Sequence, residues 1–137
     1  MTDDRTNLFE TLQKMRLLLV EDDALVRNSL RLFFENEGCR LEVLETAEEA
    51  VDAVRRREYD IVITDYRLPG MDGLNFLREL HSCRPRTMRV LLTAYMDEDV
   101  LADAFRVGVH EFIEKPFSSR DIEEALSRLI AKRAAAV

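Results

Sequence analysis

Acidic side chains stand directly after two apolar runs of this sequence. Glu21 and Asp22 follow the run Leu17–Val20, and Asp65 follows the run Ile61–Thr64 and precedes a loop rich in turn-forming residues. Short apolar runs bounded by turns are typical of buried strands in a parallel sheet, and such sheets bind ligands at the carboxyl ends of their strands. Three acids at one edge repel one another, so the sequence predicts a bound cation there.

Two further polar residues stand at the ends of later runs. Thr93 closes the run Met88–Thr93, and Lys115 lies just beyond a weaker run at Glu111–Ile113. Carboxylate oxygens suit Mg²⁺, and Mg²⁺ held by carboxylates usually binds a phosphoryl group as well. A lysine ammonium and a threonine hydroxyl can bind further phosphoryl oxygens. Phosphoryl transfer needs mostly positioning and charge neutralisation, and a carboxylate can be its nucleophile by forming an aspartyl-phosphate; Asp65 is the candidate.

Each of these residues also has a purely structural interpretation. An acid after the first run can cap the first helix, which is the role we favour for Asp23, and Asp65 can cap a turn. Thr93 can be a residue that simply favours a strand, and Lys115 can be a surface lysine. The chemical interpretation is favoured because, Asp23 aside, all these residues fall at the carboxyl ends of otherwise apolar strands.

The composition is that of one globular domain, with 137 residues, 47% hydrophobic content and a formal net charge of −7. The negative charge argues against nucleic-acid binding by this domain alone and fits a metal ion and protein partners. No apolar stretch approaches the length of a membrane span, and no signal peptide opens the chain, so we expect a cytoplasmic protein without membrane contact. Cys39 and Cys83 predict reduced thiols, and His81 and His110 lie too far apart in sequence to suggest a zinc site.

Strand-like runs alternate with helical patterns along the chain, which predicts right-handed βαβ units and a parallel sheet. The expected strands lie at about 17–20, 41–44, 61–64, 88–93 and 111–113, and the expected helices at about 24–37, 46–54, 74–81, 97–108 and 118–133. Gly38 is expected to end the first helix. Thr46 and Glu49 have the spacing of a capping box at the start of the second.

Four segments of the sequence, LLLVEDD, DYRLPGMDG, LLTAY and FIEKPF, carry these residues. In their order and spacing they resemble the receiver domain of two-component response regulators, over about residues 15–133. The resemblance implies an α/β, doubly wound (βα)5 flavodoxin-like fold. In that fold a five-stranded parallel sheet has the order 2-1-3-4-5 and helices cover both faces.

The two ends of the chain are expected to lie outside this domain. Residues 1–14 form an N-terminal extension in which Leu8, Phe9 and Leu12 could make one short amphipathic turn, but a frayed, flexible terminus is the prediction. Residues 134–137 form a C-terminal tail or a linker cut short. The domain is either free-standing, like chemotaxis or phosphorelay regulators, or part of a longer, for example transcriptional, regulator.

The resemblance implies a role for each residue around the acidic cluster. Asp65 resembles the phospho-acceptor, Asp22 a direct ligand of Mg²⁺, and Glu21 a ligand that acts through water. Arg67 occupies the position whose backbone carbonyl also meets the metal, for which Mn²⁺ is an alternative. The side chains of Arg67 and Tyr95 flank the site, and we hypothesise that they tune how readily water reaches the phosphate.

Further roles are implied beside the cluster. Thr93 resembles the switch hydroxyl and Lys115 the phosphate-binding lysine, and the Lys115–Pro116 bond resembles the family's cis peptide. Phe112 stands at the position of the switch aromatic, although a phenylalanine that only fills the core would give the same sequence.

The function that this resemblance implies is that of a regulatory phosphoprotein in signal transduction, not of a metabolic enzyme. A sensor histidine kinase or a histidine phosphotransfer protein donates the phosphoryl group to Asp65, and the domain itself catalyses the transfer and the slow dephosphorylation. Phosphorylation then changes the outer surface of the fourth helix, fifth strand and fifth helix. That surface contacts an effector domain, a downstream protein or, in a homodimer, a second phosphorylated copy.

The main alternative is a Mg²⁺-dependent phosphatase or phosphotransferase that also uses an Asp nucleophile. Haloacid-dehalogenase-type enzymes carry an Asp-x-Asp pair, but Arg67 stands at the second position here, and the chain has no room for a cap domain. A flavodoxin-like cofactor binder is a weaker alternative, because no Ser/Thr/Gly-rich phosphate loop follows the first strand.

Overall fold

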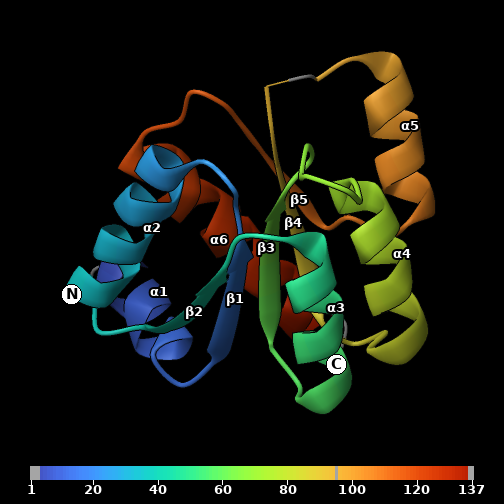
Figure 1. Ribbon diagram of the computed structural model, residues 1–137. Coiled ribbons are helices and arrows are strands. Elements are labelled where there is room, and N and C mark those ends of the chain that lie inside the picture. Colours follow the sequence, from blue (N-terminus) through green and yellow to red (C-terminus); the bar gives the residue numbers. More distant parts are fainter. Residues whose placement is uncertain (1–3, 95, 136–137) are drawn as a thin grey trace.

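The structure is a computed structural model that describes residues 4–94 and 96–135. Within these residues, strands and helices alternate after an initial helix (Figure 1). The strands are β1 (Arg16–Val20), β2 (Arg40–Leu44), β3 (Ile61–Asp65), β4 (Met88–Thr93) and β5 (Glu111–Glu114). The helices are α1 (Asp4–Leu12), α2 (Ala24–Asn36), α3 (Ala47–Arg56), α4 (Gly73–Cys83), α5 (Glu98–Arg106) and α6 (Ser119–Ala135). The predicted alternation of strands and helices is confirmed.

The strands form one parallel sheet in the order β2-β1-β3-β4-β5, which confirms the predicted doubly wound, flavodoxin-like arrangement. The chain passes from β1 outward to β2 and then returns to the other side of β1 to form β3. The order therefore reverses between β1 and β3, where Val20 is paired with Thr64. Ligand crevices form outside the carboxyl ends of strands at such a switch point. Glu21 and Asp65 directly follow these two paired residues.

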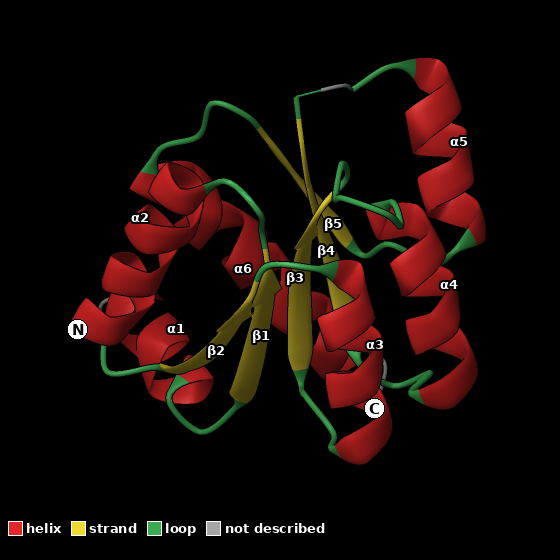
Figure 2. Ribbon diagram, viewed as in Figure 1, coloured by secondary structure: helices red, strands yellow, loops and turns green. Residues whose placement is uncertain are grey.

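Each face of the sheet has its own hydrophobic core, because successive side chains of a strand point to opposite faces. Leu17 and Leu19 belong to the core beneath α1, α2 and α6, whereas Leu18 and Val20 belong to the core beneath α3, α4 and α5. Figure 2 shows helices on both sides of the sheet. The continuous apolar runs of the sequence follow from this arrangement, since a strand covered on both faces needs an apolar side chain at nearly every position.

Local hydrogen bonds fix the ends of the helices that flank the site. Asp23 is the N-cap of α2, as predicted, and its Oδ1 accepts a hydrogen bond from the N–H of Leu25 at 2.9 Å. Thr46 caps α3, as its place in the predicted capping box suggests: its Oγ1 accepts from the N–H of Glu49 at 3.2 Å and donates to Oε1 of Glu49 at 2.9 Å. Gly38 follows α2 with a φ of 73°, a left-handed conformation that glycine adopts without strain.

Residues 4–12 are helical and packed, so the prediction of a frayed terminus is wrong for this part of the chain. The side chains of Leu8, Phe9 and Leu12 lie in the core shared with α2 and α6. The ring of Phe9 meets that of Phe33 edge-on, with 5.8 Å between centroids, a favourable geometry for two aromatic rings. The sequence gives only a weak signal for this helix. Only three of its side chains face the core, and the surface that they contact is built from segments distant in the sequence.

Ion pairs also hold α1 in place. Arg5 pairs with Glu37, just after α2, and its Nε lies 2.7 Å from an oxygen of Glu123 on α6. The same guanidinium lies over the ring of Phe9, at 4.9 Å from the centroid. Helix α1 is therefore a part of the folded unit. That the receiver domain itself begins at residue 15 stays a prediction.

The cysteines are free thiols, with Cys39 buried and Cys83 exposed. Burial and the nearby charge of Glu37 raise the pKa of the Cys39 thiol to about 11, so this residue packs as a small apolar side chain at neutral pH. None of the helices within residues 4–94 and 96–135 combines the length and the apolarity that crossing a lipid bilayer requires.

The substitution Leu12→Ala should lower the free energy of unfolding by about 2–4 kcal/mol, because it empties part of the core at a side chain that is 0% exposed. Leu32→Ala on α2 is the matched control, since that side chain is 58% exposed and its loss should change the stability by no more than about 0.5 kcal/mol. Urea unfolding of both variants and the parent measures the difference. Equal stability of Leu12→Ala and the parent would show that α1 adds nothing to the core.

Candidate functional site

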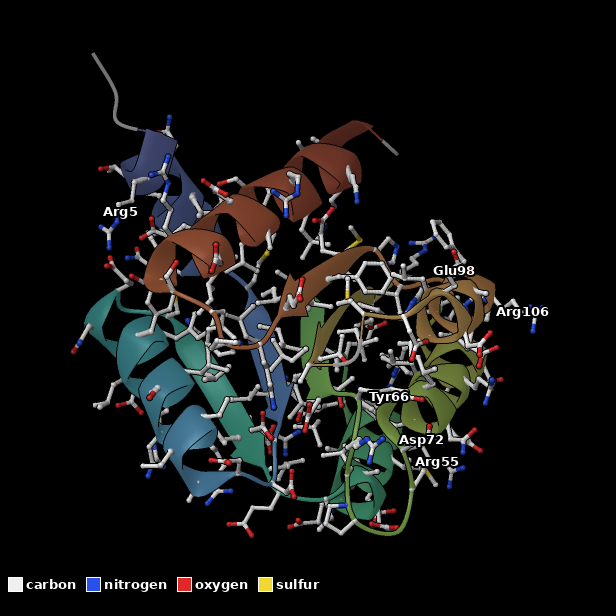
Figure 3. The ribbon with its side chains drawn as sticks, turned by 90° about the horizontal axis from the view of Figure 1, so that it is seen from above. Arg5, Arg55, Tyr66, Asp72, Glu98 and Arg106 are labelled. Carbon is white, nitrogen blue, oxygen red and sulfur yellow. The ribbon has the colours of Figure 1, made fainter. Side chains whose placement is uncertain are left out.

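The carboxyl edge of the sheet brings together the polar residues that the sequence singles out. Glu21 and Asp22 leave β1, and Asp65 ends β3. One carboxylate oxygen from each of these three residues lies within 4.8 Å of the others. Figure 3 looks onto this edge from above, with Tyr66 and Asp72 in the loop that follows β3. Residues more than 40 positions apart in the sequence thus form one cluster, because β1 and β3 are neighbours in the sheet.

Lys115 reaches the cluster from the far edge of the sheet. Its Nζ lies 2.7 Å from Oε1 of Glu21 and 3.1 Å from Oδ1 of Asp65. The N–H of Lys115 donates to the carbonyl of Thr93 at 2.8 Å, which extends the pairing of β4 and β5 one residue beyond the strand. This bond ties together the two residues predicted to bind phosphoryl oxygens. The side chain of Thr93 is buried at the end of β4.

The charges of the cluster are only partly balanced. Burial raises the pKa of Glu21 to about 7; the hydrogen bond from Lys115 opposes this shift, and the charge of Asp65 adds to it. Burial alone would lower the pKa of Lys115, but its hydrogen bonds to Glu21 and Asp65 outweigh that effect and raise it. The ammonium therefore stays charged and cannot fully compensate three acids. Carboxylate oxygens in this arrangement fit a hard divalent cation such as Mg²⁺.

Asp65 is held by the backbone of its own loop. Its Oδ1 accepts a hydrogen bond from the N–H of Tyr66 at 3.0 Å, and only 8% of the residue is exposed. The N–H of Gly73 donates to the carbonyl of Tyr66 at 2.7 Å and closes the loop. A Cβ at position 73 would lie 2.1 Å from the carbonyl oxygen of Asp65, so only glycine allows this approach. The geometry of the loop thus fixes the direction of the Asp65 carboxylate.

Two positioning residues were not predicted from the sequence. Gly73 is one, and its signal was the glycine that directly precedes the predicted helix. Arg27 is the other: its Nη1 donates to the carbonyls of Glu21 at 3.2 Å and Asp22 at 3.1 Å. Its Nη2 also lies 3.2 Å from an oxygen of Glu45. An arginine one turn into the helix after an acidic loop is a usable signal for such a clamp, because its side chain can reach back over that turn.

The remaining predicted residues lie around the cluster or outside the described chain. The peptide bond between Lys115 and Pro116 is cis. Phe112 is half-buried on β5 and packs against the core beneath α3, α4 and α5. The side chain of Arg67 is exposed in the loop after β3. Tyr95 lies outside the described residues.

Comparisons with known proteins agree with this geometry. The family model described as the response regulator receiver domain matches residues 17–127. The transcriptional regulatory protein ResD of Bacillus subtilis (strain 168) is 29% identical over 129 residues, which are 94% of this chain and 51% of ResD. The chain therefore spans about half the length of this relative.

Solved receiver domains have the same fold. The receiver domain protein (CheY-like) from Methanospirillum hungatei JF-1 superposes with a TM-score of 0.84 and 25% identity, over 90% of this chain and 98% of that one. The receiver domain of the sensor histidine kinase PA1611 from Pseudomonas aeruginosa PAO1 has a TM-score of 0.78 and 26% identity, over 85% and 98% of the two chains. In that structure a magnesium ion is coordinated in the active-site cleft.

The raised pKa of Glu21 predicts a pH dependence of stability in the metal-free protein. Because the native carboxyl titrates at about 7 rather than 4.5, the native state holds its proton more tightly than the unfolded state. The contribution of Glu21 to the free energy of unfolding is therefore complete below pH 4.5, and it is lost as the pH rises to about 7. Glu21→Gln should remove this loss of stability, which is on the order of 3 kcal/mol.

Urea unfolding in the presence of a chelator, across this pH range, measures the effect. The control is Glu35→Gln on α2, which makes the same charge change at an exposed position and should leave the pH profile of the parent unchanged. Parallel profiles for Glu21→Gln and the parent would contradict the prediction.

Proposed function

The chain belongs to the response regulator receiver domain family, and we propose that within it Asp65 is the residue that accepts the phosphoryl group. Phosphorylation and dependence on Mg²⁺ are general features of this family, whose members generally act as regulatory switches. The observation that carries the proposal is the convergence of three carboxylates with one ammonium, with the Nζ of Lys115 3.1 Å from Oδ1 of Asp65. This arrangement matches the needs of phosphoryl transfer, in which charge neutralisation and positioning dominate.

The metal ligands follow from the donor set. We propose that the carboxylates of Asp22 and Asp65, the backbone carbonyl of Arg67 and, through water, Glu21 hold Mg²⁺, with Mn²⁺ as an alternative. When bound, the ion neutralises phosphoryl oxygens and relieves the repulsion among the acids. Arg27 supports this set, because its bonds to the carbonyls of Glu21 and Asp22 keep the acidic loop in place.

The chain's own residues then carry the transfer. An oxygen of Asp65 attacks the phosphorus, and the bond from phosphorus to the donor's histidine nitrogen breaks as the new bond forms. Lys115 releases Glu21 and binds a phosphoryl oxygen, since its flexible ammonium already lies beside Asp65. The hydroxyl of Thr93 donates to another. Slow hydrolysis of this acyl phosphate by water returns the carboxylate of Asp65 and releases inorganic phosphate, so the domain acts as a switch and not as a turnover enzyme.

The donor is proposed to be a sensor histidine kinase or a histidine phosphotransfer protein, in the cytoplasm. An apolar groove of about 400 Å³ lies beside the site and is lined in part by Leu25, Val26, Lys115 and Phe117. Leu25 is 81% exposed and enlarges the apolar surface of this groove, which suits contact with a protein. A phosphodonor protein that docks here has its phosphohistidine next to Lys115 and so within reach of Asp65.

The output is proposed to leave through the face formed by α5, β5 and α6. As Thr93 moves toward the phosphate, the half-buried Phe112 turns inward. This movement shifts the equilibrium between two alternative packings of this face toward the phosphorylated one. The outer side of α5 carries Phe105, which is 76% exposed, and Arg106, which projects away from the molecule in Figure 3. An effector domain, a downstream protein or a second copy of the chain would read this surface. Both a free-standing protein and a part of a longer regulator agree with the proposal.

Asp65→Asn should abolish stable labelling by a phosphorylated kinase or by acetyl phosphate with Mg²⁺, because the amide lacks the nucleophilic oxygen, while the fold stays intact. The control Asp52→Asn makes the same change at an exposed position on α3 and should label like the parent. Mass spectrometry and circular dichroism measure both. Stoichiometric labelling of Asp65→Asn would refute the assignment, and rapid turnover of small phosphate esters by the parent would favour an Asp-nucleophile phosphatase instead.

Arg67→Ala and Tyr95→Ala should each change the rate of dephosphorylation by about threefold or more, because side chains that flank the phosphate control the approach of water; this corresponds to a barrier change of about 0.7 kcal/mol. Decay of the phosphorylated parent and of each variant, followed after removal of the donor, gives the rates. Rates equal to that of the parent would discard the idea for the residue concerned.

A further inference from the structure

The amino edge of the sheet, opposite the acidic cluster, carries a basic cleft. The cleft measures about 710 Å³ and lies between the turn after α1, the starts of β1 and β2, and the turns that follow α3 and α4, at the lower end of the strands in Figure 1. Six cations line it: Lys14, Arg16, Arg40, Arg56, Arg57 and Arg84. We call these six residues and the space between them the basic cleft.

The charge of the basic cleft is opposite to that of the whole chain, whose formal net charge is −7. Only Glu58 and Asp60 contribute acids to its lining. The side chain of Glu58 is 82% exposed and lies 3.6 Å from Arg84. Asp60 is already bound, since Oδ2 accepts from the N–H of Arg16 at 2.9 Å and Oδ1 lies 3.2 Å from Arg133. The cations therefore exceed the acids that could neutralise them.

Two arginines of the cleft start from neighbouring backbone positions. Arg16 and Arg40 are register partners at the first position of the parallel pair β1–β2, and like charges that start so close together repel each other. Among residues 4–94 and 96–135, no carboxylate forms an ion pair with Arg16, Arg40 or Lys14. An anion between these cations would relieve this repulsion.

Part of the cleft is already held in place. Nε of Arg84 donates to the carbonyl of Val54 at 2.9 Å and Nη2 to that of Arg55 at 3.4 Å. Arg57 lies 3.7 Å from an oxygen of Glu42. Guanidinium groups that are fixed before a ligand arrives lose less conformational entropy on binding.

We propose that the basic cleft binds a small anion with several linked phosphates, of the class of inorganic tripolyphosphate and the nucleoside triphosphates. Five of the six cations are arginines, whose planar fork binds phosphate oxygens in pairs. The volume falls in the range of small-molecule sites. A short anion experiences mainly the local positive field, because charges more than about 8–10 Å away are screened. A long polyanion would extend onto the acidic remainder of the surface.

A second groove continues from the basic cleft along the edge strand β2. It measures about 510 Å³. It shares Arg16, Arg40, Arg57 and Tyr59 with the cleft and adds Leu17, Leu41 and Glu42. Apolar side chains next to a phosphate site suit the base or ribose of a nucleotide. A nucleoside triphosphate would therefore occupy both the basic cleft and this groove, whereas tripolyphosphate would occupy the basic cleft alone.

Isothermal titration of the full chain with sodium tripolyphosphate, in a chelator and without divalent ions, tests the proposal. We expect saturable binding with a dissociation constant below about 1 mM that weakens as the salt concentration rises. The double variant Arg16→Gln/Arg40→Gln should bind at least about tenfold more weakly, because it removes two charged donors. The control Arg31→Gln/Arg120→Gln lowers the net charge equally at exposed positions outside the cleft and should bind like the parent.

Titration with ATP and GTP separates the two sources of linked phosphates. Tighter binding than that of tripolyphosphate assigns the apolar groove to the nucleoside, and equal binding assigns recognition to the phosphates alone. Absence of tripolyphosphate binding at about 1 mM, or equal losses in the two double variants, would overturn the proposal. Tighter binding of a DNA duplex or of polyglutamate than of tripolyphosphate would overturn it as well, since the partner would then be a macromolecule.

Thermal unfolding gives an independent measurement. Without ligand, Arg16→Gln/Arg40→Gln should unfold at a higher temperature than the control variant, because the two neighbouring like charges are gone. Tripolyphosphate should raise the melting temperature of the parent and not that of Arg16→Gln/Arg40→Gln. The proposal is separable from the function of Asp65: Asp65→Asn should bind tripolyphosphate like the parent, and Arg16→Gln/Arg40→Gln should still be labelled by acetyl phosphate.

Discussion

Repulsion among three carboxylates at one edge of the sheet is the constraint on which this structure depends. Glu21 is fully buried, and its pKa is raised to about 7 although the ammonium of Lys115 lies 2.7 Å away. A single cation therefore does not balance the cluster, and a hard divalent ion fits the oxygens that remain. The same imbalance makes the site responsive, since adding a phosphoryl group changes the charge at a place where small electrostatic differences already matter.

The fold keeps this unfavourable cluster together by distributing its attachments over separate elements. The pairing of β1 with β3 brings Glu21 close to Asp65, and the hydrogen bond from Lys115 to the carbonyl of Thr93 carries the lysine toward them from β5. Gly73 lets the following loop return to within contact of Asp65. Each attachment is a backbone contact of the sheet or of the loop that leaves it, so the surrounding backbone, and not the cluster, supplies the stability.

The errors of the sequence analysis share one cause. Helix α1 was expected to fray, because its three apolar side chains suggest only a short turn, yet they fill a surface made by α2 and α6. Arg27 and Gly73 received no role, because their importance lies in contacts with the backbone of other segments. A linear pattern reports what a segment prefers and is silent on what lies beside it. The neighbouring pair of Arg16 and Arg40 is of the same kind, since only the register of two strands brings them together.

The sequence by itself determined the strands, their alternation with helices and the chemical types at the carboxyl edge, because apolar runs and their terminal acids are local properties of the chain. Asp23 and Thr46 could be recognised as caps for the same reason. The doubly wound order was expected only from the resemblance of the sequence motifs to receiver domains. Only the tertiary structure decided the distances within the acidic cluster, the burial that shifts the pKa of Glu21, the packing of α1 and the basic cleft at the opposite edge. These depend on which strands are neighbours and in which register, and that follows from packing over the whole molecule.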